Sequence, residues 1–140
     1  MHDVNPNKRL DRLFPTNPAR QGTIYRIGDL AREFDVTLRT LRFYEDRGLI
    51  QPKRQGTTRL YSEDDRARLK VILLAKQVGF SLVEIEDVLR IFDRYEDFDD
   101  PIGDILGKLT GQMEVLRSQK AEIEEAMEKL ANAIRSLKEY

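Results

Sequence analysis

The chain has 140 residues, with 24 basic and 25 acidic side chains and a formal net charge of −1. This length allows one domain, or one small domain with an extension. The chain has no cysteine, which excludes disulfides, thiolate metal sites and thiol redox sensing within it. Because His2 is the only histidine, histidine-based catalytic triads and metal clusters are also excluded. We therefore expect no catalytic residue, metal site or cofactor, and no enzyme.

The charge is distributed unevenly along the chain. Residues 1–22 carry four basic and two acidic side chains, and residues 23–62 carry eight and five. The balance then reverses, with six and eleven over residues 63–103 and six and seven over residues 104–140. A locally basic segment favours contact with phosphates. No apolar stretch approaches the roughly 20 residues of a membrane span, and no secretion signal is present. We therefore expect a cytoplasmic, nucleoid-associated protein without a membrane partner.

Four parts are predicted along the chain. Residues 1–22 contain three prolines among polar and basic residues, which is typical of a flexible arm. The basic residues of this arm could also follow DNA, and both roles stay open. A DNA-binding domain is expected over residues 23–92, an acidic linker over 93–103 and a coiled-coil helix over 104–140.

Residues 27–46 predict two short helices joined by a tight turn at residues 35–36. The first helix has apolar residues at helical spacing, namely Ile27, Leu30, Ala31 and Phe34. Thr37 can cap the second helix through its hydroxyl. In that helix Leu38 and Leu41 are expected to pack on the first helix, while the basic and aromatic residues project elsewhere. This pattern is typical of a helix-turn-helix.

A basic hairpin and two further helices follow. Gly48 suits a left-handed position at the end of the second helix. Residues 52–61 predict two short strands around the turn at residues 55–57, which together form a wing. Ser62 with Asp65, and Ser81 with Glu84, have the spacing of capping boxes at the start of two helices that should complete a small core.

The last part of the sequence predicts a coiled coil. Its seam residues alternate spacings of three and four: Leu106, Leu109, Met113, Leu116, Lys120, Ile123, Met127, Leu130, Ile134 and Leu137. So long a seam requires a partner helix, most simply from a second copy of the chain. Parallel pairing brings no opposite charges together at the flanking positions. Antiparallel pairing brings Arg117 near Glu124 of the other chain, which favours that arrangement.

The linker at residues 93–100 concentrates carboxylates. It lacks the ligand spacing of a calcium loop, so a solvated acidic connector is favoured over a cation site. Tyr95 and Phe98 could line an effector pocket there, or could simply fill the joint.

The order of these motifs resembles the MerR family of transcription regulators. The matching stretches are YRIGDLAREFDV, TLRTLRFYEDRGLI, the wing ending in RLY, ILLAKQVGFSLVEI and the terminal coil. The resemblance implies a mainly α fold, with a winged helix-turn-helix followed by a long dimerisation helix that forms an antiparallel coiled coil. It implies a homodimer that binds a palindromic operator in promoter DNA. Effector binding would then distort the DNA so that RNA polymerase can engage.

The resemblance also implies roles for particular residues. Those expected to contact DNA are Ile27 and Gly28 at a helix N-terminus, Thr37, Arg39, Thr40, Arg42, Phe43 and Tyr44 on the recognition helix, and Lys53, Arg54, Arg59 and Tyr61 in the wing. Tyr44 and Tyr61 could instead be core residues. Arg47 is expected to form a solvated ion pair with its acidic neighbours rather than to contact DNA.

A narrower similarity points to regulators of leucine and isovalerate degradation, which would make the effector an acyl-CoA or a related catabolite. The sequence departs from the metal and oxidant sensors of the family, which use cysteines. The residues alone are also compatible with two other functions. One is an architectural DNA-binding protein without an effector. The other is a coiled-coil module whose basic ribbon touches an acidic protein.

Overall fold

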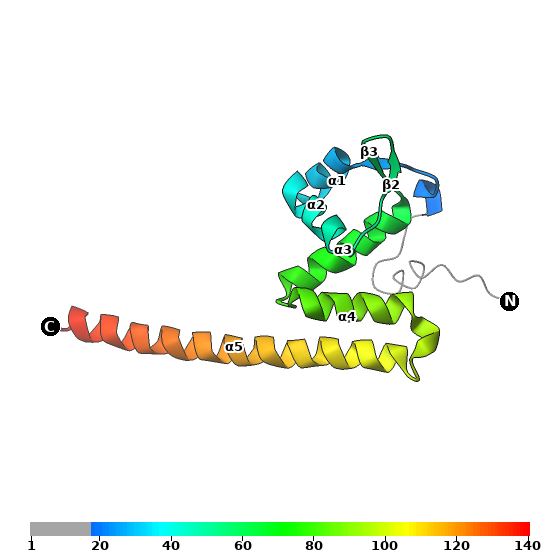
Figure 1. Cartoon of the computed structure of the whole chain (residues 1–140). Helices are drawn as coiled ribbons and strands as arrows, with labels where there is room; N and C mark the ends of the chain where they lie inside the picture. Colours follow the sequence, from blue (N-terminus) through cyan, green and yellow to red (C-terminus); the bar gives the residue numbers. More distant parts are fainter. Residues whose placement is uncertain (1–17) are drawn as a thin grey trace. The chain divides into compact units, whose positions relative to one another are not determined.

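The computed structural model describes residues 18–140, which form two compact units, one ending at Pro101 and the other spanning Ile102–Tyr140 (Figure 1). Residues 1–17 of the predicted arm lie outside the described residues. The elements in chain order are η2 (Pro18–Arg20), β1 (Tyr25–Arg26), α1 (Ile27–Phe34), α2 (Leu38–Asp46), β2 (Lys53–Gln55), β3 (Thr58–Tyr61), α3 (Glu63–Gln77), α4 (Leu82–Asp93), η3 (Tyr95–Asp97) and α5 (Pro101–Lys138). The predicted mainly α fold with a wing and a long final helix is confirmed.

The helix-turn-helix is formed by α1 and α2. Asp35 ends α1 in the left-handed conformation, with φ of 53°, and Thr37 caps α2 by accepting a hydrogen bond from the Thr40 amide at 3.1 Å. Leu41 is fully buried, as predicted. Leu38, the first residue of α2, is only partly buried, with 39% of its surface exposed.

The wing contains one strand more than the sequence indicated. The antiparallel strands β2 and β3 pair Arg54 with Arg59 and turn at Gly56, which has φ of 63°. The two-residue strand β1 adds to the other edge of β3 by pairing Tyr25 with Tyr61, which gives the order β1-β3-β2. Because β1 leads directly into α1, this pairing fixes the start of α1 beside the wing.

A buried carboxylate holds β1 in place. Glu63, at the start of α3, is only 2% exposed. It accepts hydrogen bonds from the Tyr25 hydroxyl at 2.6 Å and from Arg66 at 2.9 Å. Arg66 also pairs with Glu33 of α1. Burying a charge is tolerated only when it is paired, and here the pairing joins β1, α1 and α3.

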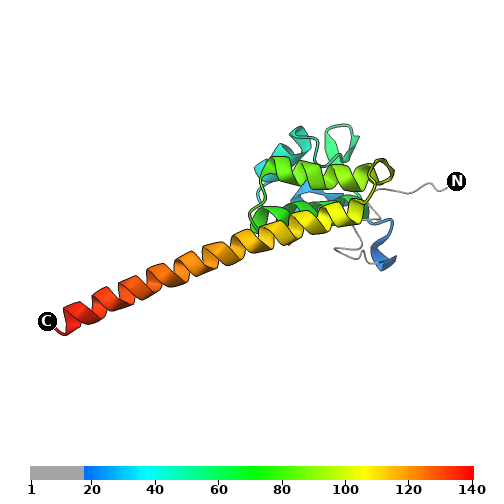
Figure 2. The same cartoon turned by 90° about the horizontal axis from the view of Figure 1, so that it is seen from below.

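Both predicted capping boxes are present at the start of α3 and α4. The Asp65 amide donates to the Ser62 hydroxyl at 3.1 Å, and the Glu84 amide donates to the Ser81 hydroxyl at 3.2 Å. The two helices pack side by side and close the core of the first unit (Figure 2). Its largest fully buried side chains are Leu30, Leu41, Ile50, Tyr61, Leu69, Ile72, Ile85, Leu89 and Phe92.

The second unit is almost entirely the helix α5. It has 38 residues, so its length is about 57 Å at ~1.5 Å per residue. Pro101 is its first residue, a position where proline's missing amide hydrogen costs nothing. The apolar seam residues toward its end are exposed, with Ile123 at 60%, Met127 at 64% and Leu137 at 78%.

Candidate nucleic-acid interface

The N-terminus of α1, the helix α2 and the wing meet at one cleft. This α1–wing cleft has a volume of about 420 Å³ and is lined by Arg26, Ile27, Gly28, Asp29, Arg32, Leu38, Arg42, Thr57, Thr58 and Arg59. Four arginines stand there against one aspartate. The first amides of a helix have no partner within the helix, so Ile27 and Gly28 present N–H groups to an anion. The cleft has the chemistry of a phosphate site.

The structure therefore brings together four of the residues predicted to contact DNA, namely Ile27, Gly28, Arg42 and Arg59. The sequence indicated no DNA contact for the two other arginines of this cleft, Arg26 and Arg32. Arg26 follows the paired residue Tyr25 in β1, and its backbone amide donates to Asp29 at 2.8 Å. A strand of two residues leaves no periodic signal, so the position of Arg26 could not be predicted.

The rest of the α2 face borders a second groove. This groove has a volume of about 310 Å³ and is lined by Arg39, Thr40, Phe43, Tyr44, Lys76 and Leu82. Arg39 is exposed, and Phe43 is 43% exposed. Lys76, in the last turn of α3, adds a cation to this groove that the sequence did not assign to the interface. The residues of α2 that are expected to contact DNA thus line two different hollows. Arg42 lines the α1–wing cleft, and Arg39 lines this groove.

The wing arginines are bound to the recognition helix by an acidic residue. Arg54 donates to Glu45 at 2.6 Å, and the Nε of Arg59 donates to the other carboxylate oxygen of Glu45. The side chains of Glu45 and Arg59 are 13% and 18% exposed, whereas that of Arg54 is 50% exposed. We call these three residues the Glu45 cluster. Lys53, the first residue of the wing, is exposed.

The Glu45 cluster shifts the ionisation of its members. Burial alone would raise the pKa of Glu45, but the hydrogen bonds and charges of Arg59 and Arg54 outweigh it and lower the pKa below its usual value. Glu45 therefore stays a carboxylate at neutral pH. It ties the wing to α2.

Two of the predicted DNA contacts lie in the core instead. Tyr61 is completely buried, and among the described residues its hydroxyl has no hydrogen-bond partner. Burial raises the pKa of Tyr61 to about 12. Tyr61 is the last residue of β3 and its one buried residue, and it pairs with Tyr25 of β1. Tyr61 as a wing contact is therefore corrected. Tyr44 is 4% exposed and is also a core residue, although it borders the groove of α2.

Arg47 does not pair with its neighbours on α2. It contacts Glu86 of α4 at 3.3 Å and lies over the ring of Phe43, with 5.9 Å between the guanidinium carbon and the ring centre. The prediction that Arg47 pairs with its neighbours Glu45 and Asp46 was therefore wrong, because Glu45 binds the wing arginines instead. An ion pair with a distant helix leaves no signal in the sequence.

The remaining predictions concern an effector pocket, a metal site and a membrane span. Tyr95 and Phe98 are half-buried in and directly after η3, and neither lines the clefts described here. Within residues 18–140 no group of three or more acidic or histidine side chains could hold a metal. Over the same range no helix is long and apolar enough to cross a membrane.

Comparison with known proteins identifies the family. The model described as MerR HTH family regulatory protein matches residues 25–90, and the model described as MerR, DNA binding matches residues 66–140. The transcriptional regulator ZntR of Escherichia coli K12 is 44% identical over 70 residues, or 49% of this chain and 50% of that protein. The transcriptional activator TipA of Streptomyces coelicolor is 34% identical over 113 residues, or 74% of this chain and 41% of that protein. The chain thus spans about half the length of the curated relatives that it matches.

Solved structures agree with this assignment. HiNmlR, a MerR family regulator lacking the sensor domain and bound to promoter DNA, superimposes with a TM-score of 0.61 at 25% identity, covering 76% of this chain and 80% of HiNmlR. The N-terminus of MtaN, the Bacillus subtilis multidrug transporter activator, superimposes with a TM-score of 0.58 at 30% identity, covering 79% and 97% of the two chains. These relatives are regulators rather than enzymes. The chain, with its winged helix-turn-helix and its long final helix, belongs to the MerR family of helix-turn-helix regulatory proteins.

Proposed function

We propose that the protein is a transcriptional regulator that binds promoter DNA as a homodimer on a palindromic operator. The observation that carries this proposal is the α1–wing cleft, where helix amides, Arg42 of the recognition helix and Arg59 of the wing meet. A recognition helix enters the major groove while the flanking cations and amides hold phosphates. The solved relative HiNmlR is bound to promoter DNA, which supports the same use of this surface here.

The dimer rests on α5. Apolar side chains recur along this helix at coiled-coil spacing and are exposed, and a second α5 would bury them. We favour the antiparallel pairing because it places Arg117 near Glu124 of the partner. In the single chain Arg117 pairs with Glu114 at 2.6 Å, and Glu124 lies 4.0 Å from Lys120. These local pairs are highly exposed, so they can be exchanged for contacts with the partner at little cost.

The effector is proposed to be a small molecule that is not sensed through thiols, because the chain has no cysteine to bind a soft metal or to be oxidised. Effector binding would change the geometry of the two DNA-binding units and distort the promoter, which lets RNA polymerase engage. An acyl-CoA ester is the candidate that the narrower sequence similarity favours.

Footprinting on the promoter beside the protein's own gene tests this function. We expect a protected palindrome between the promoter elements, with altered cleavage at its centre when an acyl-CoA ester is added. Binding should weaken with salt, with a slope of log K near −0.9 per neutralised phosphate. A footprint away from promoter elements that ignores the esters would instead indicate an architectural DNA-binding protein. No protection at low salt would refute DNA binding itself.

A further inference from the structure

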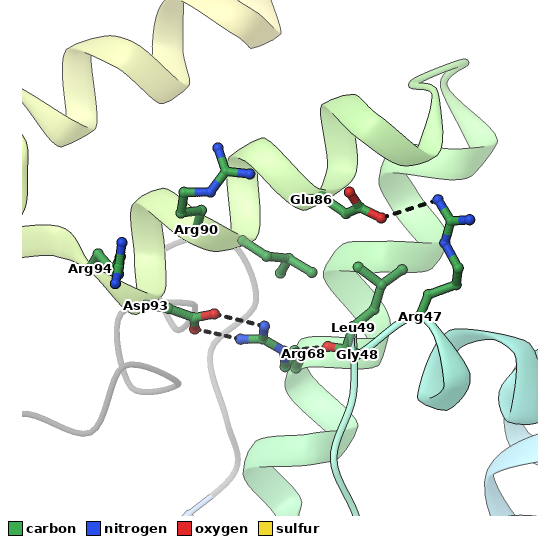
Figure 3. Close-up of a pocket in the computed structure, with 9 residues that line it drawn as sticks. Arg47, Gly48, Leu49, Arg68, Glu86, Arg90, Asp93 and Arg94 are labelled. Atoms are coloured by element: carbon green, nitrogen blue, oxygen red, sulfur yellow. Dashed lines mark hydrogen bonds and ion pairs between the residues drawn. The ribbon is translucent and has the colours of Figure 1, made fainter.

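The first unit has a second basic pocket that the DNA interface does not use (Figure 3). Its volume is about 360 Å³, and its lining comes from the end of α2, from α3 and from α4. The lining residues are Arg47, Gly48, Leu49, Arg68, Glu86, Leu89, Arg90, Asp93 and Arg94. None of them lines the α1–wing cleft or the groove of α2.

The pocket is net positive, although most of its lining residues belong to a net acidic segment of the chain. Four arginines and two carboxylates line it, whereas the segment from residue 63 to residue 103 carries six basic and eleven acidic side chains. The buried residues Leu49 and Leu89 supply an apolar base. Apolar walls lower the local dielectric constant, which strengthens the attraction between the arginines and an anion.

One arginine is fixed and builds the wall of the pocket. Arg68 donates to both oxygens of Asp93, at 2.7 and 2.9 Å, and its Nε donates to the Leu49 carbonyl at 2.6 Å. Its side chain is only 13% exposed. This bidentate pair joins α3, α4 and the loop after α2, as the dashed lines of Figure 3 show, and it neutralises Asp93.

The other three arginines hold weak, exposed ion pairs. Arg47 is 45% exposed and contacts Glu86 at 3.3 Å. Arg90 is 55% exposed and pairs with Asp87 at 2.9 Å, and Arg94 is 69% exposed with Asp97 at 3.9 Å. Exposed pairs of this kind contribute little to stability, so a ligand can replace the carboxylates at little cost.

We propose that this pocket binds the compact oxyanion of a small metabolite that carries two or more negative charges. Both a diphosphate and a dicarboxylate group have this chemistry. The four arginines exceed the two carboxylates of the lining by two charges, which such a group would balance. Guanidinium groups bind these oxyanions through paired, charge-assisted hydrogen bonds.

A ligand in this pocket would contact the end of the recognition helix α2 directly. Arg47 is the C-cap residue of α2, and Gly48 and Leu49 follow it. An anion bound in this pocket would therefore lie against both the end of α2 and α4. A ligand with different affinity for two placements of α2 shifts the balance between them. The pocket would thus be an effector site, and this regulatory part rests on the proposed function.

The binding site is tested by NMR titration of the full chain at constant ionic strength, without DNA, using inorganic pyrophosphate and succinate as probes. We expect saturable shifts of the amides of Gly48, Leu49 and the second half of α4. Tighter binding of pyrophosphate would identify a diphosphate site, and tighter binding of succinate a dicarboxylate site. Shifts that cluster at Ile27 and Gly28 instead would place the anion on the DNA interface and overturn the proposal.

Variants with opposite expected effects sharpen the test. Arg90→Gln should weaken binding of the preferred probe about fivefold, because it removes a cation from the rim. Glu86→Gln should tighten binding, because it removes a carboxylate that competes for Arg47. Lys129→Gln is the control, since Lys129 also forms an exposed ion pair, with Glu125 at 3.5 Å, and lines neither this pocket nor the DNA interface. Equal effects of Lys129→Gln and Arg90→Gln would contradict a specific pocket.

The regulatory part is read in a separate titration with operator duplex. We expect the preferred probe to change duplex affinity at least threefold, and the duplex to change probe affinity by the same factor. Arg90→Gln should bind duplex normally without the probe but lose this response. An unchanged duplex affinity would refute regulation through the pocket. Failure to bind any duplex would refute the proposed function, while the NMR result without DNA stands independently.

Discussion

Replacing Glu45 by glutamine should loosen the wing from the recognition helix. Glu45 is the only carboxylate of the Glu45 cluster, and both of its oxygens are used, one by Arg54 and one by Arg59. Glutamine has nearly the same shape but carries no charge and keeps a single acceptor oxygen. The substitution therefore removes one of the two hydrogen bonds and the charge attraction of both pairs, without creating a cavity.

The expected loss of stability depends on how exposed the two ion pairs of Glu45 are. The Arg59–Glu45 pair is mostly buried, at 18% and 13% exposure, and a hydrogen bond between charged groups contributes about 1.5–3 kcal/mol there. Arg54 is half exposed, so its pair adds no more than about 1 kcal/mol. Because glutamine still accepts one hydrogen bond, we expect the free energy of unfolding to fall by about 2 kcal/mol.

The pH dependence of this stability difference tests the same reasoning independently. The arginines lower the pKa of Glu45 in the folded protein, so its contribution to stability is complete above the ordinary glutamate pKa of about 4.3. That contribution is lost as the pH falls through the lowered pKa and the carboxylate becomes protonated. The difference between the wild type and Glu45→Gln should therefore be largest near pH 7 and shrink below about pH 4.

Urea denaturation at fixed protein concentration measures this difference, with Glu125→Gln as the control. Glu125 pairs with Lys129 at 3.5 Å, but both side chains are about two-thirds exposed or more, so its loss should change stability by less than about 0.5 kcal/mol. If Glu45→Gln is as stable as the wild type at pH 7, or if the difference persists at pH 3, the Glu45 cluster does not hold the wing.

Four further substitutions test other parts of the molecule. Arg42→Ala should weaken operator binding by about 1–3 kcal/mol in a fluorescence titration, and an equal loss on unrelated duplex would show that Arg42 does not read bases. Tyr61→Phe should leave operator affinity unchanged and the melting temperature equal or higher, because the lost hydroxyl has no partner among the described residues; weaker DNA binding would restore Tyr61 as a contact. Lys120→Leu should stabilise the dimer by about 1.5–3 kcal/mol per chain in calorimetry, and a less heat-stable variant would contradict the seam. Glu124→Arg should weaken dimerisation in sedimentation experiments, and failure of added Arg117→Glu to restore it would refute antiparallel pairing.

Features with local causes could be predicted from the sequence. The capping boxes at Ser62 and Ser81 depend only on a residue three positions later, and both formed as predicted. The left-handed turn at Asp35 and the hairpin turn at Gly56 also follow from neighbouring residues. The helix α5 could be predicted because its seam residues recur at regular spacings of three and four.

Features that depend on distant residues could not be predicted. The strand β1 exists because Tyr25 pairs with Tyr61, which is 36 positions away. Glu45 belongs to the wing arginines rather than to its neighbour Arg47 because folding brings β3 against α2. The same tertiary packing turns Tyr61 inward. The sequence left open whether Tyr61 contacts DNA or lies in the core, because a tyrosine next to basic residues suits both positions.

The proposed DNA contacts and the dimer seam stay predictions. They share one requirement, which is that two copies of the chain bind one operator together. A single α1–wing cleft reaches only one half-site, and a palindrome repeats that half-site about one helical turn or more away. In the proposed dimer, the seam of α5 supplies the link between the two DNA-binding units.

The most direct measurement is therefore the mass of the complex between the protein and a duplex that carries one palindromic operator, determined by sedimentation at low and moderate salt. We predict two chains per duplex and no stable complex with one chain, and both half-sites should be needed for full affinity. A single chain bound to the duplex, or a chain that remains a monomer and does not bind the duplex at low salt, would contradict the central claim.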